Sequence, residues 1–105
     1  MKILTVLGAA LLSTVVAAPV MAEETIEESC GYQAAVVAAV QQARRDRVKE
    51  RDLTETLIAA EPTWPENYNA AIPLVAPWIY EQKMKVIRKE DLGAVWKEQC
   101  LAQTQ

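Results

Sequence analysis

Apolar residues recur at helical spacing along most of the chain, and this pattern predicts the secondary structure. The first regular stripe consists of Tyr32, Val36, Val40 and Ala43. Spacings of three and four residues mark one face of an α-helix. We therefore expect a helix over about residues 31–49, whose many alanines would let a neighbouring helix approach closely.

A second helix is predicted over residues 52–61. Asp52 has the features of an N-cap, and Glu55 three residues later would complete a capping box, in which each side chain bonds the other's backbone N–H. The helix should stop before Pro62, because proline disfavours helical backbone in the preceding residue. Its inward-facing residues would be Leu53, Leu57 and Ile58.

The next helix contains the most apolar stretch, AIPLVAPWIY at residues 71–80. Pro65 suits the first position of this helix. Pro73 and Pro77 lack N–H groups, so the carbonyls of Asn69 and Pro73 lose their usual partners, and either one kinked helix or two abutting short helices should result. The inward stripe would be Tyr68, Ile72, Val75, Ile79 and Val86.

A last helix is predicted over residues 92–103, capped by Asp91 or its neighbour. Its inner side would carry Leu92, Val95, Trp96 and Cys100. No strand-like alternation is sustained, and Asn-Gly and Asp-Gly hairpin turns are absent from the sequence. The predicted fold is therefore all-α: a small bundle of about four helices, formed by two stacked long-short helical hairpins and stapled by one disulfide.

The N-terminal part of the chain predicts export. Residues 1–22 form a largely uncharged run rich in Leu, Val and Ala, and Val20 and Ala22 occupy the positions that a signal peptidase recognises. An acidic stretch follows without a stop-transfer pattern, so we expect cleavage after Ala22 and not a retained membrane anchor. The expected periplasmic product is a flexible acidic tail, residues 23–28, and a single helical domain, residues 29–105.

Cys30 and Cys100 are the only two cysteines. A single pair in an exported chain predicts a disulfide. Closing a loop of about 70 residues would stabilise so small a domain by about 4 kcal/mol on the chain-entropy model. The wide separation argues against a redox-active pair, which usually has the form C-x-x-C.

Charge and composition exclude several classes of function. Without residues 1–22 the chain has ten Lys or Arg and fourteen Asp or Glu, which leaves a net charge of −4 and argues against nucleic acid as a ligand. Residues 44–52, RRDRVKERD, are interpreted as a solvated helix face, with a local basic patch for an acidic partner or anionic headgroups as the alternative.

Catalytic and cofactor-binding signatures are missing from the sequence. It contains no histidine, and with both cysteines paired no thiolate nucleophile or cysteine zinc site is available. No nucleophile elbow, phosphate loop or dinucleotide fingerprint occurs. We predict that the protein is not an enzyme and holds no metal or cofactor. A small carboxylate-dependent enzyme is the remaining catalytic alternative, using Glu50 with Asp52, Glu61 with Glu66, or Glu90 with Asp91.

Residues 71–80 admit two interpretations. They form either the core of the bundle or a surface left partly exposed for a partner. The second interpretation predicts a protein-binding ridge, here called the apolar ridge, of Trp64, Tyr68, Leu74, Pro77 and Trp78. The stretch is too short to span a bilayer. We therefore expect a non-catalytic binding module for another envelope protein.

In its bulk features the chain is similar to small exported helical acid-stress chaperones of the HdeA class. The shared features are a signal peptide, a short mature chain, helices, and one disulfide between distant positions. The resemblance implies release of apolar surface to unfolded clients when acid loosens the fold. Protonation of carboxylates that pair or cap in the native state would drive such loosening. An acid-stress chaperone is therefore the alternative function.

Overall fold

The computed structural model describes residues 23–103, which form five α-helices and two short 3₁₀-helices without a strand. In chain order these elements are α1 (Ile26–Arg45), η1 (Glu50–Asp52), α2 (Leu53–Ala59), η2 (Glu66–Ala70), α3 (Ala71–Glu81), α4 (Met84–Lys89) and α5 (Leu92–Gln103). The prediction of an all-α fold is confirmed. The predicted signal peptide, residues 1–22, lies outside the described residues.

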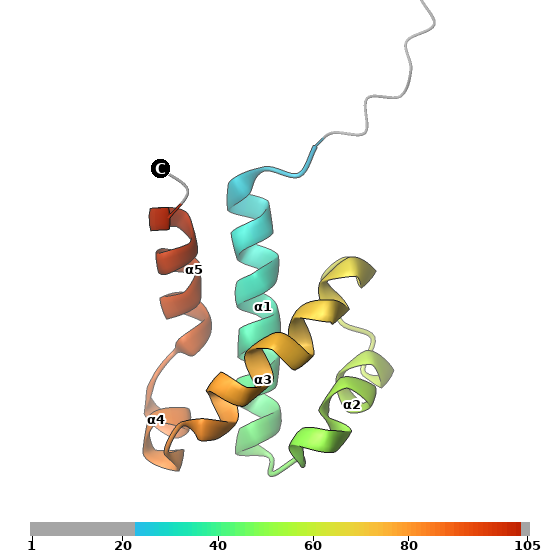
Figure 1. The fold of residues 1–105 in the computed structure, drawn as a ribbon, viewed down its shortest axis with the longest axis vertical. Coiled ribbons are helices and arrows are strands. Elements are labelled where there is room, and N and C mark those ends of the chain that lie inside the picture. The colour runs from blue at the N-terminus through green and yellow to red at the C-terminus, as the bar shows by residue number, and fades with distance from the viewer. Residues whose placement is uncertain (1–22, 104–105) are drawn as a thin grey trace, which may run out of the picture.

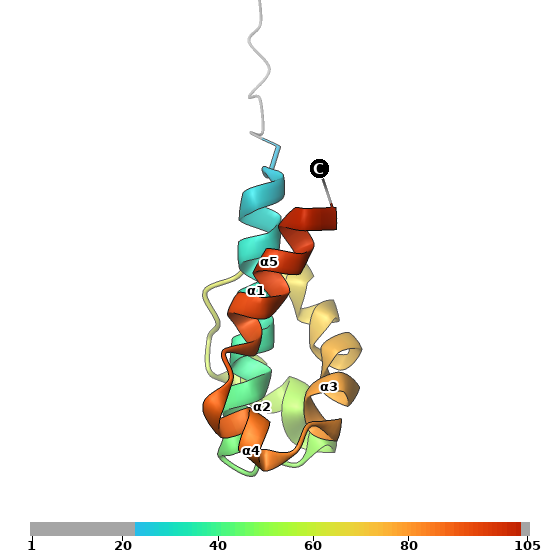
Figure 2. The ribbon, with the colours of Figure 1, turned by 90° about the vertical axis from the view of Figure 1, so that its left-hand side faces the viewer.

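Helix α1 is the element against which the other helices pack. α5 runs back along one side of α1, and α3 crosses α1 on another side, close to α2 (Figure 1). A view at right angles shows the same pairing of α1 with α5, and α3 separate from α5 (Figure 2). The first part of the chain, α1 and α2, therefore meets the second part, α3 to α5, along α1.

The disulfide between Cys30 and Cys100 confirms the predicted link between the first and last helices. The two Cα atoms are 5.7 Å apart, and the bond joins positions separated by 70 residues in the sequence. Small residues bring the start of α5 close to the middle of α1. A Cβ atom added at Gly93 would lie 2.9 Å from the carbonyl oxygen of Ala34 and 3.3 Å from the Cβ of Ala38. The expected close approach of a helix to the alanines of α1 is therefore observed.

α1 begins at Ile26, five residues before the predicted start, and so includes part of the predicted acidic tail. The reason is a capping box. The Thr25 hydroxyl accepts a hydrogen bond from the backbone N–H of Glu28 at 3.0 Å, and the Glu28 carboxylate accepts one from the backbone N–H of Thr25 at 3.4 Å. α1 ends at Arg45, before the predicted residue 49, and Arg47 beyond it adopts a left-handed φ of 64°.

The capping box predicted at Asp52 is wrong. Asp52 has helical backbone angles, φ −97° and ψ −3°, and its side chain makes no capping hydrogen bond. It belongs to η1, so a 3₁₀ turn leads into α2 where the prediction required an extended residue. α2 ends at Ala59, and Glu61 adopts a left-handed φ of 53° directly before Pro62, so the predicted stop is confirmed.

The proline-containing segment forms two helices and not one continuous helix. Gln82 and Lys83 separate α3 from α4 and have extended ψ angles of 144° and 145°. Pro73 lies in the first turn of α3, where a helix does not need its N–H, and Pro77 lies inside it. Pro65 comes just before η2 and is not the first residue of a helix.

The buried core follows the predicted stripe with some changes. Ile72 and Ile79 are fully buried and Val75 nearly so, but Ile87 is buried in place of Val86, because α4 starts a new helix with its own register. Ile58 and Val95, predicted to face inward, are 45% and 37% exposed. The core consists of Val36, Val37, Val40, Ala43, Leu53, Trp64, Ile72, Val75, Ala76, Ile79, Ile87 and Leu92.

One buried polar side chain, Gln41 of α1, joins α1 to the α4–α5 junction. Its amide nitrogen donates to the carbonyl oxygens of Ile87 at 2.9 Å and Glu90 at 2.7 Å. Its amide oxygen accepts from the backbone N–H of Leu92 at 3.2 Å. Gln41 thereby binds carbonyl groups at the end of α4 and an N–H group at the start of α5, which neither helix satisfies internally.

Candidate functional site

The apolar ridge predicted from the sequence is divided by the structure. Trp64 is only 8% exposed, and its indole N–H donates to the side-chain oxygen of Asn69 at 2.8 Å, so it belongs to the core and not to a surface. Leu74 is 79% exposed and Pro77 is also exposed. Trp78 is half-buried. Its ring centre lies 5.7 Å from that of Trp96 in α5. α3 therefore buries one side in the core and presents an apolar outer side.

Tyr68, the remaining residue of the apolar ridge, is half-buried in η2, just before α3 and near the start of α1. Its hydroxyl donates to the carboxylate of Glu24 at 2.5 Å and lies 2.9 Å from the hydroxyl of Ser29. Its ring centre is 5.3 Å from that of Tyr32. The hydrogen bond to the Glu24 carboxylate raises the pKa of Tyr68 above its ordinary value, because that carboxylate favours the protonated phenol.

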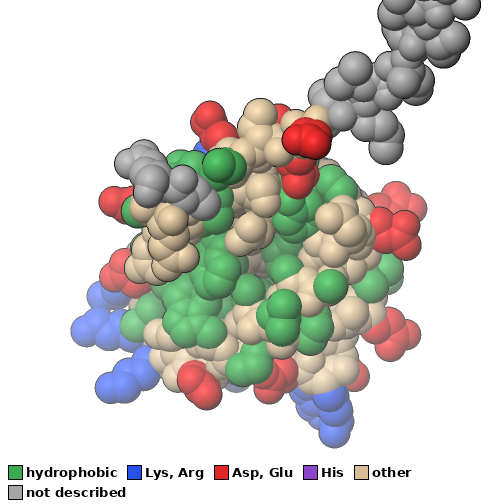
Figure 3. All heavy atoms as spheres, turned by 45° about the horizontal axis from the view of Figure 1, so that its top comes forward, with side chains coloured by type: hydrophobic (Ala, Val, Ile, Leu, Met, Phe, Trp, Pro, Cys, Tyr) green, Lys and Arg blue, Asp and Glu red, His purple; other side chains and the backbone are tan. Residues whose placement is uncertain are grey.

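A groove lies between α3 and α5 and is here called the α3–α5 groove. One part, of about 390 Å³, is lined by Gln33 and Trp96 and, from η2 and α3, by Tyr68, Ala71, Leu74 and Val75. A second part, of about 310 Å³, is lined by Gln33, Trp96, Gln99, Cys100 and Gln103. Gln33 and Trp96 line both parts, so the two parts adjoin at this pair, and the second part is bounded by α1 and α5. Figure 3 shows hydrophobic side chains around a hollow on this face of the molecule.

The α3–α5 groove has a fixed frame. The amide oxygen of Gln33 accepts a hydrogen bond from the indole N–H of Trp96 at 3.0 Å, and its amide nitrogen donates to Ser29 at 3.3 Å. The Cys30–Cys100 disulfide joins α1 to α5 beside this contact. The helical pattern predicted Trp96 on the inner side of the last helix, but Gln33 is a polar residue among alanines and carries no local signal of such a role.

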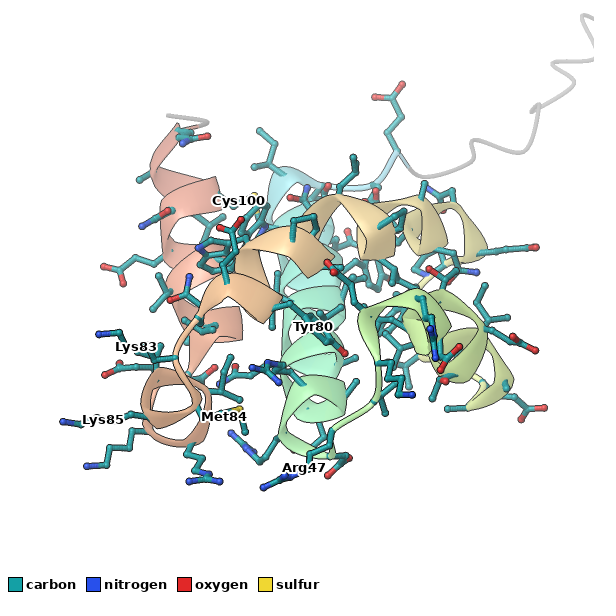
Figure 4. All side chains as sticks on the ribbon, turned by 60° about the horizontal axis from the view of Figure 1, so that its bottom comes forward. Arg47, Tyr80, Lys83, Met84, Lys85 and Cys100 are labelled. Atoms are coloured by element: carbon teal, nitrogen blue, oxygen red, sulfur yellow. A yellow bond between two sulfur atoms is a disulfide. The ribbon has the colours of Figure 1, made fainter. Side chains whose placement is uncertain are left out.

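Basic side chains are concentrated in two chain segments, and Asp52, Glu81, Glu90 and Asp91 lie within two residues of them. Residues 44–51 and 83–89 hold nine of the ten Lys and Arg residues of the described chain, with two Asp or Glu among them; we call this region the basic end. A hydrogen bond of 2.8 Å from Arg45 to the carbonyl oxygen of Ile87 joins the two segments. Figure 4 shows Arg47 at the end of α1 and Lys83 and Lys85 at α4, on the same side of the molecule.

The carboxylate pairs considered as catalytic candidates lie mostly at helix starts and turns. Glu90 and Asp91 line a small cavity of about 250 Å³ together with Arg45. The Asp91 carboxylate accepts a hydrogen bond from the backbone N–H of Ala94 at 3.0 Å and so caps α5, as predicted. Within residues 23–103 no group of three or more metal-ligating side chains is found.

Helices long and apolar enough to cross a membrane do not occur in the part of the chain that the structure describes. Comparison with protein-family models, with curated proteins and with solved structures found no match for this chain. The α3–α5 groove and the exposed side of α3 are therefore the observations from which a function can be argued.

Proposed function

We propose that the protein is a non-catalytic, exported helical module that binds another protein of the cell envelope through the α3–α5 groove and the outer side of α3. The observation that carries this proposal is Leu74, which is 79% exposed at the edge of the groove. Single exposed leucines are common on protein surfaces. Leu74 differs because it stands between two exposed prolines and beside an apolar concavity.

Residues 67–80 contain no charged side chain, although they include this exposed surface. Depletion of charge and enrichment of aromatic residues are typical of the centre of a protein interface. Pro73 and Pro77 restrict the backbone of α3, and the disulfide and the Gln33–Trp96 hydrogen bond hold α5. A surface fixed before binding loses little conformational entropy when a partner docks, which favours affinity.

Export is supported by two independent features of the chain. The apolar N-terminal run with its Val-Met-Ala ending is typical of a secretory leader. The disulfide is typical of an oxidising compartment, since cytosolic proteins rarely keep one. Both features agree with a partner in the cell envelope.

Acid-stress chaperone activity is the second candidate, and it is favoured by the position of three carboxylates. Glu28 caps α1, Asp91 caps α5, and Glu24 accepts the hydrogen bond of Tyr68 at the edge of the α3–α5 groove. Loss of these three interactions would weaken the ends of the helices that frame the groove, and a loosened but compact state of this kind exposes apolar surface. The disulfide would still hold α1 and α5 together, so that apolar surface would open without complete loss of compactness.

A photo-reactive amino acid at position 74 tests the two candidates in intact cells. Ile58 on α2 is 45% exposed and away from the groove, so the same substitution there is the matched control. The proposed function predicts one discrete adduct from position 74 at neutral pH and none from position 58. A broad set of adducts that appears only after acid shock would favour the chaperone. Equal labelling from both positions, or none from either, would refute both.

A further inference from the structure

We infer that the α3–α5 groove binds an apolar segment of another protein with lysines or arginines at its ends. This inference rests on the proposed function and adds the chemistry of the partner. The supporting observations are the lining of the groove, the distribution of charge around it, and the burial of residues 83–89, which makes this segment of a second copy unsuitable as the occupant.

The lining of the α3–α5 groove favours a neutral, largely apolar centre for the bound segment. None of the residues that line it is charged. Leu74, Val75 and Trp96 would contact apolar side chains of the segment, because removing apolar surface from water is favourable. Gln99 and Gln103 on the α5 side carry amide groups that both donate and accept, as a peptide backbone requires. A charged side chain at the centre of the bound segment would lose its hydration and gain no charged partner in the groove, which is unfavourable.

The surroundings of the groove favour positive charge at the ends of the segment. Glu24 is bonded to the groove residue Tyr68, Glu66 precedes the lining residue Asn67, and Glu27 and Glu28 lie in the first turn of α1. Nine of the ten described Lys and Arg residues lie at the basic end. The tenth, Lys97 beside Trp96, is followed by Glu98. Cationic flanks would therefore be attracted to this face and anionic flanks repelled.

A second copy of this chain does not fit the groove well. Its residues 83–89, KMKVIRK, have the required pattern of apolar residues between basic ones. However, Ile87 is fully buried and Met84 and Val86 are half-buried against the core, so their apolar surface is not available for docking. The groove is therefore assigned to a different protein that presents such a segment freely.

The test uses three synthetic peptides with the same centre of leucine and alanine and with lysine, glutamate or serine flanks. Binding to the purified, oxidised domain is followed by NMR through the indole N–H signal of Trp96 and by titration. Lysine flanks are expected to improve the Kd about tenfold over glutamate flanks at low ionic strength, as several exposed ion pairs would give. This preference should shrink to less than about threefold in 0.5 M salt, where such pairs are screened.

Leu74→Asp should abolish peptide binding without unfolding the domain, because Leu74 is 79% exposed; Ile58→Asp on the 45% exposed control residue should leave it unchanged. Glu66→Lys should reduce the preference for lysine flanks. If all three peptides bind equally well and Leu74→Asp abolishes the binding of each, the inferred charge pattern is overturned but the proposed function is not. Absence of binding, or Leu74-dependent dimerisation of the domain, would overturn the inference, while the in-cell adduct from position 74 decides the proposed function separately.

Discussion

Replacement of Gln41 by methionine should destabilise the domain strongly, although the two side chains have similar volumes. Gln41 is 5% exposed and makes three hydrogen bonds, to the carbonyls of Ile87 and Glu90 and to the N–H of Leu92. Ile87 would keep its hydrogen bond from Arg45 at 2.8 Å, but the N–H of Leu92 would be left buried without a partner. The three hydrogen bonds, at about 1 kcal/mol each, amount to about 3 kcal/mol, and the unsatisfied buried donor makes this value a lower bound.

Urea unfolding followed by circular dichroism at equilibrium would measure this change. For a domain of this size a loss of about 3 kcal/mol lowers the midpoint by roughly 2 to 3 M urea. Gln42→Met is the matched control, because Gln42 is exposed and bonds only to Asp46 and Arg45 on its own helix; it should change stability by less than about 0.5 kcal/mol.

A second variant, Gln41→Glu, separates the role of the hydrogen bonds from that of packing. Glutamate keeps an acceptor for the N–H of Leu92 but loses both donors and places a carboxylate against two carbonyl groups. It should be at least as unstable as Gln41→Met at neutral pH and should recover in part in acid, because a protonated carboxyl can donate again. Stability of Gln41→Met within about 0.5 kcal/mol of the parent would refute this account of the α4–α5 junction.

Three further predictions concern packing, alkaline pH and the disulfide. Gly93→Ala should lower the free energy of unfolding, measured by thermal denaturation, by about 1–3 kcal/mol, because the new Cβ would lie 2.9 Å from a backbone oxygen of α1. Gly31→Ala is the control: no atom lies within 4 Å of its new Cβ, so it should raise the free energy of unfolding by about 0.5–1 kcal/mol. Burial raises the pKa of Tyr80. The stabilisation of the folded state by the protonated Tyr80 side chain is therefore complete below about pH 10 and is lost as pH rises further. Tyr80→Phe should therefore make the fall of the free energy of unfolding with alkaline pH less steep. Reduction of Cys30–Cys100, which closes a 70-residue separation, should lower the free energy of unfolding by up to about 4 kcal/mol in a denaturant titration under reducing conditions, and an unchanged midpoint would contradict the entropic estimate.

The sequence predicted those features of the fold that depend on local periodicity or on composition. Ile72, Val75 and Ile79 repeat at helical spacing, and a helix buries such a stripe whatever its neighbours are. The link between Cys30 and Cys100 followed from there being one pair of cysteines in a chain that was predicted to be exported.

The capping boxes show where local patterns fail. Thr25 with Glu28 and Asp52 with Glu55 have the same spacing, and the prediction chose the second pair. The deciding factor is the backbone before the helix. Thr25 is extended, with ψ 159°, and its hydroxyl therefore reaches the first turn, whereas Asp52 already belongs to a 3₁₀ turn. Sequence spacing alone does not distinguish these two conformations.

The candidate site depended on contacts between distant parts of the chain. Trp64 was included in the predicted apolar ridge because aromatic residues are enriched at binding hot spots, but it is buried against the core and bonds to Asn69. The α3–α5 groove requires α1 to hold α5 through Gln33 and Trp96, which are 63 residues apart. The sequence left open whether Leu74 is buried or exposed, because its helix is apolar on nearly every face; the structure shows that it is 79% exposed. Its position beside a groove was not predictable from periodicity.

The most direct measurement of the proposed function is the mass of the species cross-linked to position 74 in intact cells at neutral pH. The account predicts one adduct whose mass exceeds that of the chain alone by that of a different protein, and whose cross-linked peptide is apolar with lysine or arginine on both sides. An adduct of twice the mass of the chain, or labelling of position 74 no stronger than that of position 58, would contradict it.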